Sequence, residues 1–398
     1  MNTILSIEQR NAVLKSMAGL VAQKIEAILK ANRKDIKEFA ENDTAMYDRL
    51  IVDKNKIQGM IASLDQLAGQ EDPVGRDLFH FTHENGLKIV NRTASFGTVM
   101  IIYESRPDVT IEAGGIAFKS GNKILLKGGK EAINSNLAIV DLWHLALKEN
   151  DITTDWVEYL NYDRKKTQKF LKNPGQKVDL IVPRGGERLI AFVKENASCP
   201  VIVSGRGNNF VYVHKEADRE MAIDIIVNAK TAKISACNAL DKVLIDRDLP
   251  DFNGFVRTLV SKLSEYGVEI SGDKVIEEFN GVSAIPNEDI WYKEFLDLKI
   301  VIGGIKSYKE AIAKINKYSG GHSAAIITKD KNAAKLFMDS VDTAAVYHNA
   351  STRFTDGFQF GLGGELAIST DKLHQRGPIG LQHLVTNKWY ILGDGQIR

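Results

Sequence analysis

The chain has 398 residues, 44% of them hydrophobic and 26% charged, a composition typical of soluble globular proteins. Its 52 Lys and Arg residues balance 51 Asp and Glu residues, which argues against nucleic acid as the main partner. The two cysteines exclude a disulfide framework, and with no CxxC or HExxH spacing we expect no metal site. No secretory signal and no apolar run of the ~20 residues that span a bilayer are visible, so we expect a cytoplasmic protein without a membrane partner.

The first predicted elements are a helix and a hairpin. Ser6 and Gln9 have the spacing of a capping box, and apolar residues then recur on one face as far as Leu29, which indicates a helix. Asn85-Gly86 lies between two short strand-like runs, and this pattern predicts a β-hairpin over residues 78–93.

From Val99 onward, short apolar runs alternate with helical stretches. This pattern is typical of βαβ units, and it predicts a parallel sheet with helices on both faces. Ligands of such sheets bind beyond the carboxyl ends of the strands. The expected strands are 99–103, 124–126, 157–160, 178–182 and 201–203, and the expected helices are 111–119, 132–148 and 187–195.

A second alternating series begins near Val211 and predicts a second α/β domain. A final apolar run over 388–392 is interpreted as a separate strand. The expected helices of the second series are 217–229 and 252–266, and its expected strands are 242–245, 299–302 and 324–327.

Cys237 lies between the helix 217–229 and the strand 242–245, with Lys230 and Lys233 close to it in the sequence. Positive charge favours the thiolate, which is the nucleophilic form of cysteine. Most free cysteines are instead small buried hydrophobic residues, so the local sequence leaves both interpretations open.

Two glycine pairs follow predicted strands. Gly185 and Gly186 open a helix, where backbone N–H groups can bind an anion. Gly128 and Gly129 lie between Lys127 and Glu131, a lysine suited to phosphate and a carboxylate suited to a ribose hydroxyl. A tight turn between strand and helix explains the first pair equally well.

Three polar residues in loops are candidate ligands of an anionic substrate. Arg106 follows the strand 99–103, and Arg353 lies in the polar segment 349–357. Arginine binds carboxylate and phosphate groups through two parallel hydrogen bonds, although each of these arginines is also compatible with an ordinary surface position. His322 follows two glycines, and it is interpreted either as a site residue or as a loop histidine.

These segments together resemble the γ-glutamyl phosphate reductase family of the aldehyde dehydrogenase superfamily. The resemblance covers essentially the whole chain, and the stretches Ala350–Gly357 and Gly395–Arg398 are specific to this branch. The other matching stretches are 103–110, 119–122, 128–129, 183–186, 228–231, 237–239, 321–322, 360–363 and 374–378.

The resemblance implies an α/β, aldehyde dehydrogenase-like fold with two Rossmann-like parallel-sheet domains and a small β oligomerisation element. Residues 1–77 and 96–210 would form an NADP-binding domain, and residues 211–376 a catalytic domain with the nucleophilic cysteine. Residues 78–95 and 377–398 would form the oligomerisation element of a homodimer or homotetramer.

The implied reaction is the second step of proline biosynthesis from glutamate. NADPH would reduce the small-molecule substrate L-glutamate 5-phosphate to L-glutamate 5-semialdehyde and phosphate, through a thioester on Cys237. The preceding glutamate 5-kinase, which makes this labile substrate, is a candidate partner.

The resemblance also implies roles for individual residues. Lys127 and Glu131 align with the adenosine-ribose site, where a lysine suits the 2′-phosphate of NADP. Gly185 and Gly186 would lie beside the cofactor phosphates. Glu294 resembles the carboxylate that binds the nicotinamide ribose. The predicted contacts of the glutamyl carboxylate and phosphate are Arg106, His322 and Arg353.

Two departures from the family pattern stand out. Lys233 replaces an arginine that many relatives have before the cysteine, and Asp108 replaces the usual asparagine after Arg-Pro. The segment 204–209 lacks the carboxylate with which hydrolytic relatives activate water. This absence argues against a hydrolytic aldehyde dehydrogenase, and the retained Cys237 and Arg353 argue against a catalytically inactive scaffold.

Overall fold

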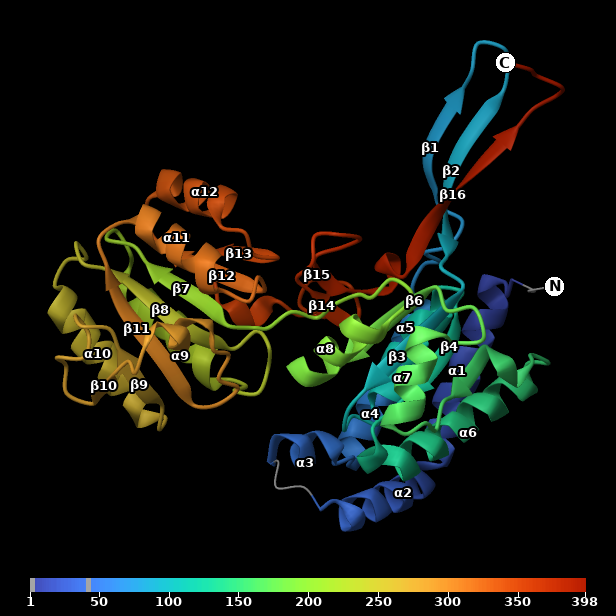
Figure 1. Ribbon diagram of the computed structural model, residues 1–398, viewed down its shortest axis with the longest axis horizontal. Helices are drawn as coiled ribbons and strands as arrows, with labels where there is room; N and C mark the ends of the chain where they lie inside the picture. Colours follow the sequence, from blue (N-terminus) through green and yellow to red (C-terminus); the bar gives the residue numbers. More distant parts are fainter. Residues whose placement is uncertain (1–3, 41–43) are drawn as a thin grey trace. The chain divides into compact units, whose positions relative to one another are not determined.

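The computed structural model describes residues 4–40 and 44–398, and its chain divides into two units (Figure 1). Unit 1 comprises Met1–Val203, Gly361–Ala367 and Ile379–Arg398, and unit 2 comprises Ser204–Phe360 and Ile368–Pro378. The sequence analysis placed the corresponding change of domain at residue 211.

Unit 1 contains a four-stranded sheet in the order β5-β4-β3-β6, in which all neighbours are parallel, as predicted. The strand expected over 201–203 does not form: only an isolated bridge pairs Val201 with Ile181. The strands are β3 (Thr98–Tyr103), β4 (Lys123–Lys127), β5 (Val157–Tyr159) and β6 (Leu180–Arg184).

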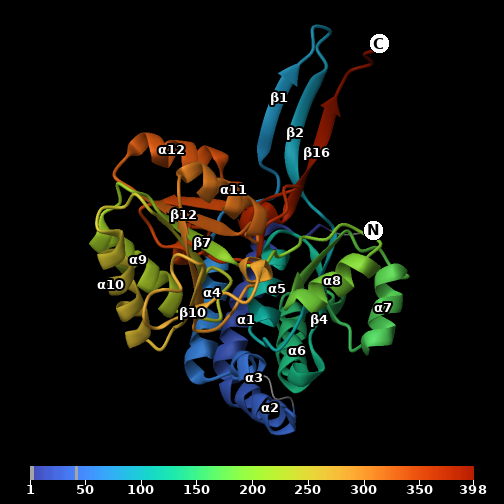
Figure 2. The same cartoon turned by 60° about the vertical axis from the view of Figure 1, so that its left-hand side comes forward.

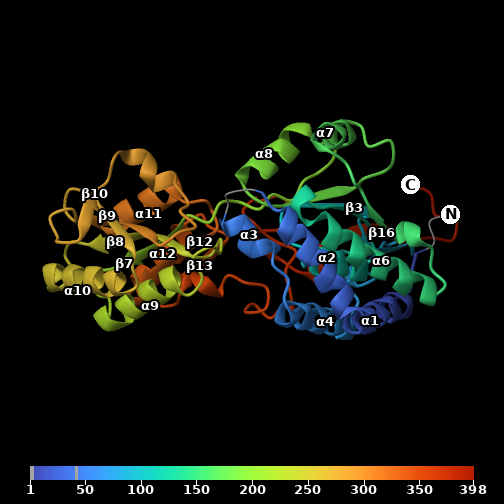
Figure 3. The ribbon, with the colours of Figure 1, turned by 90° about the horizontal axis from the view of Figure 1, so that it is seen from below.

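Helices cover both faces of this sheet (Figure 3). The capping box of Ser6 and Gln9 is present, but the predicted first helix is interrupted at Lys24, which ends one helix and begins the next. One face carries α1 (Ile7–Gln23), α4 (Lys54–Gly69), α5 (Val109–Lys119) and α6 (Ile133–Glu149); the other carries α7 (Arg164–Lys172) and α8 (Glu187–Asn196); α2 (Ile25–Glu38) and α3 (Thr44–Leu50) complete the unit.

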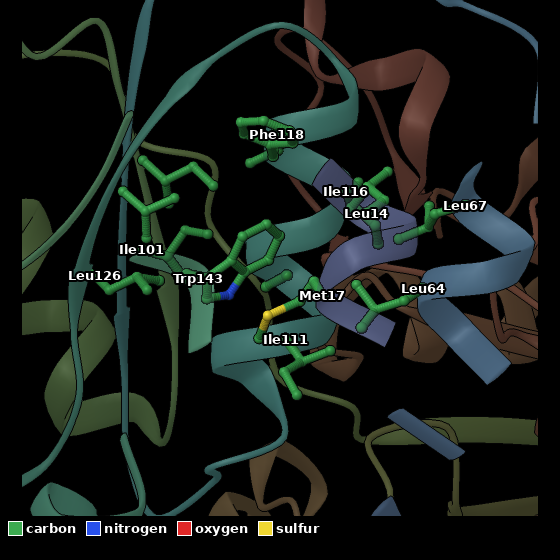
Figure 4. Close-up of a cluster of buried hydrophobic side chains, with 14 of the residues drawn as sticks. Leu14, Met17, Leu64, Leu67, Ile101, Ile111, Ile116, Phe118, Leu126 and Trp143 are labelled. Atoms are coloured by element: carbon green, nitrogen blue, oxygen red, sulfur yellow. The ribbon is translucent and has the colours of Figure 1, made fainter. Parts of the chain in front are cut away.

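The main core of unit 1 lies between the sheet and helices α1, α4, α5 and α6 (Figure 4). Trp143 of α6 is fully buried, and its indole N–H donates to the carbonyl of Thr110 at 3.1 Å, so its polar atom is satisfied. Leu64 of α4 is also fully buried. This packing supports the carboxyl ends of the strands, where the predicted cofactor residues lie.

A three-stranded antiparallel arm projects from unit 1 (Figure 2). Its strands are β1 (Asp77–Thr82), β2 (Lys88–Ser95) and β16 (Val385–Leu392), with β2 in the centre. The predicted hairpin is confirmed, and Gly86 in its turn has φ +88°, a conformation that favours glycine.

Unit 2 contains a seven-stranded, fully parallel sheet in the order β10-β9-β11-β8-β7-β12-β13. Helices α9 and α10 cover one face, and α11 and α12 cover the other (Figure 1). The elements are β7 (Asn209–Val213), α9 (Arg219–Thr231), β8 (Leu240–Asp246), α10 (Phe252–Glu265), β9 (Glu269–Gly272), β10 (Val282–Ala284), β11 (Lys299–Ile305), α11 (Tyr308–Tyr318), β12 (Ser323–Ile327), α12 (Lys331–Ser340) and β13 (Ala345–His348).

A two-stranded sheet of β14 (Ala367–Ser369) and β15 (Gly377–Ile379) lies where the chain passes from one unit to the other. Among residues 4–40 and 44–398, no helix is both long and apolar enough to cross a membrane.

We expect Leu64→Ala to lower the free energy of unfolding of unit 1 by about 2–5 kcal/mol, because it leaves a cavity in a fully buried core. Leu145→Ala makes the same chemical change at a position on α6 that is 42% exposed, and it should cost less than about 0.5 kcal/mol. Urea unfolding of both variants measures the difference, and equal losses would contradict this description of the core.

Candidate active site

Cys237 lies in the short loop of unit 2 between α9 and β8, and it is partly exposed. The loop is tightly turned, with the N–H of Ala236 donating to Lys233 O and the N–H of Ala239 donating to Ala236 O. Gly207 approaches this loop so closely that a Cβ there would lie 2.2 Å from Cys237 O. Glycine at 207 is therefore a steric requirement of the loop's position.

Two asparagine side chains hold the Cys237 loop. The Asn209 amide donates to the carbonyls of Cys237 and Ala239, both at 2.7 Å. The Asn238 amide donates to the carbonyls of Arg353 at 3.2 Å and Thr355 at 2.9 Å. The loop is thus fastened on one side to the start of β7 and on the other to the polar segment that contains Arg353.

Arg353 is the cation that the fold brings to Cys237. Burial lowers the pKa of its guanidinium, and a negative charge on Cys237 acts in the opposite direction, as does Asp356. Its Nε and Nη1 atoms are buried and have no hydrogen-bond partner among the described residues. Buried donors of this kind are suited to an anionic ligand.

Lys230, one of the two lysines near Cys237 in the sequence, is bound to other groups. Lys230 is fully buried, and its ammonium donates to Leu240 O at 2.9 Å and to Asp241 Oδ1 at 3.3 Å. Lys233 is exposed. Arg353, which is distant in the chain, therefore brings to Cys237 a positive charge that the neighbouring sequence does not mark.

His322 lies inside unit 2 and has no exposed surface. Its Nδ1 atom is 2.8 Å from Ser323 Oγ, which is 2.7 Å from Thr355 Oγ1, and Tyr347 OH completes the chain of hydrogen bonds at 2.6 Å. Its Nε2 atom is buried and has no partner within the described chain. The structure thus links His322 to the segment that follows Arg353.

Glu294 also lies close to the Cys237 loop. Its Oε1 atom accepts the backbone N–H of Gly207 at 3.0 Å, and this is the glycine that packs against Cys237 O. Unit 2 therefore brings together four of the predicted site residues, which are Cys237, Glu294, His322 and Arg353.

Three of these residues lie at one common end of the unit 2 sheet. Cys237, Glu294 and His322 precede β8, β11 and β12, so they lie at the amino ends of parallel strands. Ligands of parallel sheets usually bind beyond the carboxyl ends of the strands, so these candidate residues lie at the opposite end of their sheet.

The predicted cofactor residues of unit 1 do follow that rule. Lys127 ends β4, while Gly185 and Gly186 follow β6. Glu131 accepts both the backbone N–H of Ser105 at 2.7 Å and its hydroxyl at 2.8 Å, which ties it to the segment after β3. The structure therefore brings all four residues to the carboxyl ends of three neighbouring strands.

Glu104, in the segment after β3, organises the glycine pair. Its Oε2 atom accepts the backbone N–H of Gly186 at 2.9 Å, at the start of α8. A Cβ on Gly185 would lie 2.3 Å from the same carboxylate, so a larger residue there would displace the Glu104 side chain. A Cβ on Gly186 would meet nothing within 4 Å, which leaves the start of α8 open to a ligand.

Lys127 is a partly buried cation among carboxylates. Burial lowers the pKa of its ammonium, while Glu131, Asp163 and Glu104 act to raise it. Its Nζ atom donates to Gly128 O at 2.8 Å, which holds the side chain against the glycine pair. The arrangement suits a phosphorylated ribose. The lysine can balance the charge of the phosphate, and the carboxylates can accept hydrogen bonds from the ribose hydroxyls.

Arg106 lies in a charged cluster at the start of α5. Burial and Asp108 raise the pKa of Glu112 to about 7, and Arg184, Arg106 and Lys56 oppose this rise. Lys56 Nζ lies 3.7 Å from Asp108 Oδ1. Arg106 therefore lies near the carboxyl group of Glu112, and a ligand held in this cluster would meet both signs of charge.

Sequence reasoning missed the residues that organise the site, notably Asn209, Asn238, Glu104 and Ser105. They bind backbone or side-chain atoms that are remote in the sequence, so no local spacing marks them. Only the φ of +43° at Ser105 is unusual in itself, and it becomes visible in the structure alone.

Among the described residues, no group of three or more His, Cys, Asp and Glu could hold a metal ion.

Comparison with known proteins shows which family this fold belongs to. The family model described as "Aldehyde dehydrogenase family" matches residues 3–277. A γ-glutamyl phosphate reductase from Kosmotoga olearia is 43% identical over 99% of this chain and 95% of its own length, and one from Lachnospira eligens is 42% identical with the same coverage.

The crystal structure of γ-glutamyl phosphate reductase from Thermotoga maritima superposes with a TM-score of 0.94 at 40% identity, covering 99% of this chain and 95% of that one. The chain belongs to the aldehyde dehydrogenase family, in its γ-glutamyl phosphate reductase branch. Its fold is the aldehyde dehydrogenase fold, and the protein is an oxidoreductase of that family. The family uses a nicotinamide cofactor.

Burial lowers the pKa of His322 to about 4 from its ordinary 6.5, so the unfolded chain binds a proton at a higher pH than the native chain does. Stability is therefore lost as the pH falls from 6.5 towards 4, by up to about 3 kcal/mol. Between pH 7 and pH 5 we expect wild type to lose about 2 kcal/mol more than His322→Gln does.

Urea unfolding at the two pH values measures this difference. Equal pH dependence in wild type and His322→Gln would show that His322 is not buried in its neutral form.

Proposed function

We propose that the protein reduces L-glutamate 5-phosphate with NADPH to L-glutamate 5-semialdehyde and phosphate, through a thioester on Cys237. This is the second step of proline biosynthesis from glutamate. The observation that carries the proposal is the partly exposed Cys237 in a fixed loop beside the buried donors of Arg353. The names of the relatives that cover 99% of the chain support the choice of substrate.

The first step is attack of the Cys237 thiolate on the acyl carbon of the substrate. The carbon–sulfur bond forms, the bond from carbon to the phosphate oxygen breaks, and phosphate leaves with the electron pair. Arg353 supplies a cation beside the sulfur, which favours the thiolate, and its two unpartnered nitrogens can bind anionic oxygens of the substrate. The product of this step is the thioester.

The developing oxyanion requires hydrogen-bond donors that are already in place. The Asn209 and Asn238 amides serve this purpose indirectly, because they fix the backbone on both sides of the sulfur. We propose the backbone N–H of Cys237 as one donor. Arg106 and Arg353 are the proposed contacts for the carboxylate and phosphate of the substrate, and His322 acts behind Arg353 through Ser323 and Thr355.

The residues of unit 1 fit a dinucleotide. The open backbone at Gly186 suits a phosphate, and Lys127 with Glu131 suits a ribose that carries a 2′-phosphate. Glu294 of unit 2 is the proposed ligand of the nicotinamide ribose. When bound, NADPH supplies the hydride that reduces the thioester. Cys237 then leaves as the thiolate, and the semialdehyde is released.

Hydrolysis would compete with this reaction if a base activated water at the thioester. The segment 204–209 offers no carboxylate, and Glu294 Oε1 is already bound by the N–H of Gly207. The two cysteines form no disulfide, which fits our proposal of a reducing, cytoplasmic setting. The kinase that makes the acyl phosphate stays a predicted partner.

The arm is the proposed oligomerisation element, and its proposed binding partner is a second copy of this chain. The pairing puts Phe79, Asn91 and Trp389 on one face, together with Phe81, Ile89 and Ile391. Phe79, Phe81, Trp389 and Ile391 are each about half exposed, and both outer strands have open edges. An apolar face of this kind with unpaired edges indicates an interface.

The reverse reaction tests the proposed function. Purified protein with glutamate 5-semialdehyde and NADP should form NADPH only when inorganic phosphate is present, because phosphate is the acyl acceptor. Cys237→Ser should lower the rate by about 10³-fold or more. Cys199→Ser is the matched control and should stay within about two-fold of wild type, because Cys199 lies in unit 1 and burial raises its pKa.

Formation of NADPH without phosphate would overturn the proposal in favour of hydrolysis. A Cys237→Ser variant with wild-type rate would overturn the thioester.

Trp389→Glu should shift the protein towards the monomer, because it places a charge in the apolar face of the arm. Light scattering after size-exclusion chromatography measures the mass at micromolar concentration. Met338→Glu on α12 is the control, with a similar exposure of 42% outside the arm, and it should keep the wild-type mass. A monomeric wild type would contradict the proposed interface.

A further inference from the structure

Unit 2 contains a buried cluster of three charged side chains that the proposed chemistry does not use. Lys230 and Lys242 are fully buried and Asp241 is 2% exposed. Two ammonium groups and one carboxylate leave an excess of positive charge in the interior, and such burial is costly unless each group has compensating partners. The partners of this cluster therefore indicate what it does.

Lys242 binds the segment that carries Glu294. Its Nζ atom donates to Lys293 O at 2.7 Å and lies over the ring of Phe295, 4.0 Å from the centroid. The carboxylate of Asp241 accepts the backbone N–H of Phe295. The residues on both sides of Glu294 are thus fastened to β8.

Lys230 completes the cluster from α9. It donates to Leu240 O and Asp241 Oδ1, which orients the carboxylate that accepts the Phe295 N–H. Burial lowers the pKa of Lys242 to about 7, and Asp241 and Glu294 act to raise it. Glu294 is therefore close enough to Lys242 to stabilise its ammonium group.

This segment needs such an anchor because regular structure does not hold it. It lies between the 3-10 helix Glu288–Tyr292 and the start of β11. Leu296 has φ +52°, a conformation that is costly for a residue with a side chain. A cavity of about 460 Å³ is lined in part by Lys293 and Phe295.

We propose that Lys242 is a positioning residue, which holds the segment Lys293–Leu296 so that Glu294 is presented to the nicotinamide ribose. The inference rests on the proposed function, because it takes Glu294 as a cofactor ligand. Glu294 has the N–H of Gly207 as a second attachment, so its carboxylate is fixed from two directions. In this proposal Lys242 acts through the segment that it holds.

The experiment compares NADPH binding with the chemistry of Cys237. Lys242→Met removes the charge and the donor, and it should raise KM and Kd for NADPH about ten-fold or more. The rate of Cys237 alkylation by iodoacetamide should stay within about two-fold of wild type, because Asn209 and Asn238 hold that loop. Lys242→Arg, which keeps the charge, should restore most of the affinity.

Lys262→Met on α10 is the matched control, since this exposed lysine pairs only locally with Glu265. It should keep the wild-type KM. A Lys242→Met variant with wild-type KM would overturn the proposal, as would equal losses of NADPH binding and of thiol reactivity. If Lys242→Met does not fold, Phe295→Leu decides: it removes only the ring, and an unchanged KM for NADPH would overturn the proposal.

A double-mutant cycle shows whether Lys242 acts through Glu294. Glu294→Gln should raise KM for NADPH, and adding Lys242→Met should raise it by less than two-fold further, because the positioned group is already lost. Multiplicative effects of the two changes would overturn the proposal. A wild-type protein that neither binds NADPH nor forms it in the reverse reaction would refute the proposed function itself, which is a different result.

Discussion

The site in unit 2 depends on two buried side-chain amides. A tight loop such as the one around Cys237 leaves backbone carbonyls without partners, and buried carbonyls require donors. Asn209 and Asn238 each supply two donors to two carbonyls, so four hydrogen bonds fix three segments at once. Because an amide offers two hydrogens in one rigid plane, the position of the sulfur relative to Arg353 is set by geometry rather than by packing alone.

The two units use similar parallel sheets in opposite ways. In unit 1 the polar residues follow the strands, and short segments such as Glu104-Ser105 cross-link neighbouring strand ends. In unit 2 three candidate site residues lie in loops before the strands, and a glycine at 207 lets one of these loops contact another. A sheet therefore fixes only where its loops begin and end, while the side chains that connect the loops select which end becomes a site.

Features set by neighbouring residues were predictable from the sequence, including the Ser6 capping box and the turn at Gly86. Family resemblance supplied the candidate residues, and the structure brings Cys237, Glu294 and Arg353 together. The break at Lys24, the single bridge at Val201 and the burial of Lys230 depend on tertiary packing, so no local pattern marked them. Closeness in the sequence was misleading for Lys230, because its ammonium binds Asp241 instead of lying beside the sulfur of Cys237.

The path of the chain has a consequence for synthesis on the ribosome. Strand β2 emerges before unit 2, whereas its partner β16 emerges after it. The long segment Ser204–Phe360 contains the complete seven-stranded sheet, so it can assemble while the arm still lacks a strand. During that interval β2 presents an open edge and an uncovered face in a nascent chain, where pairing with a neighbouring polypeptide competes with correct closure.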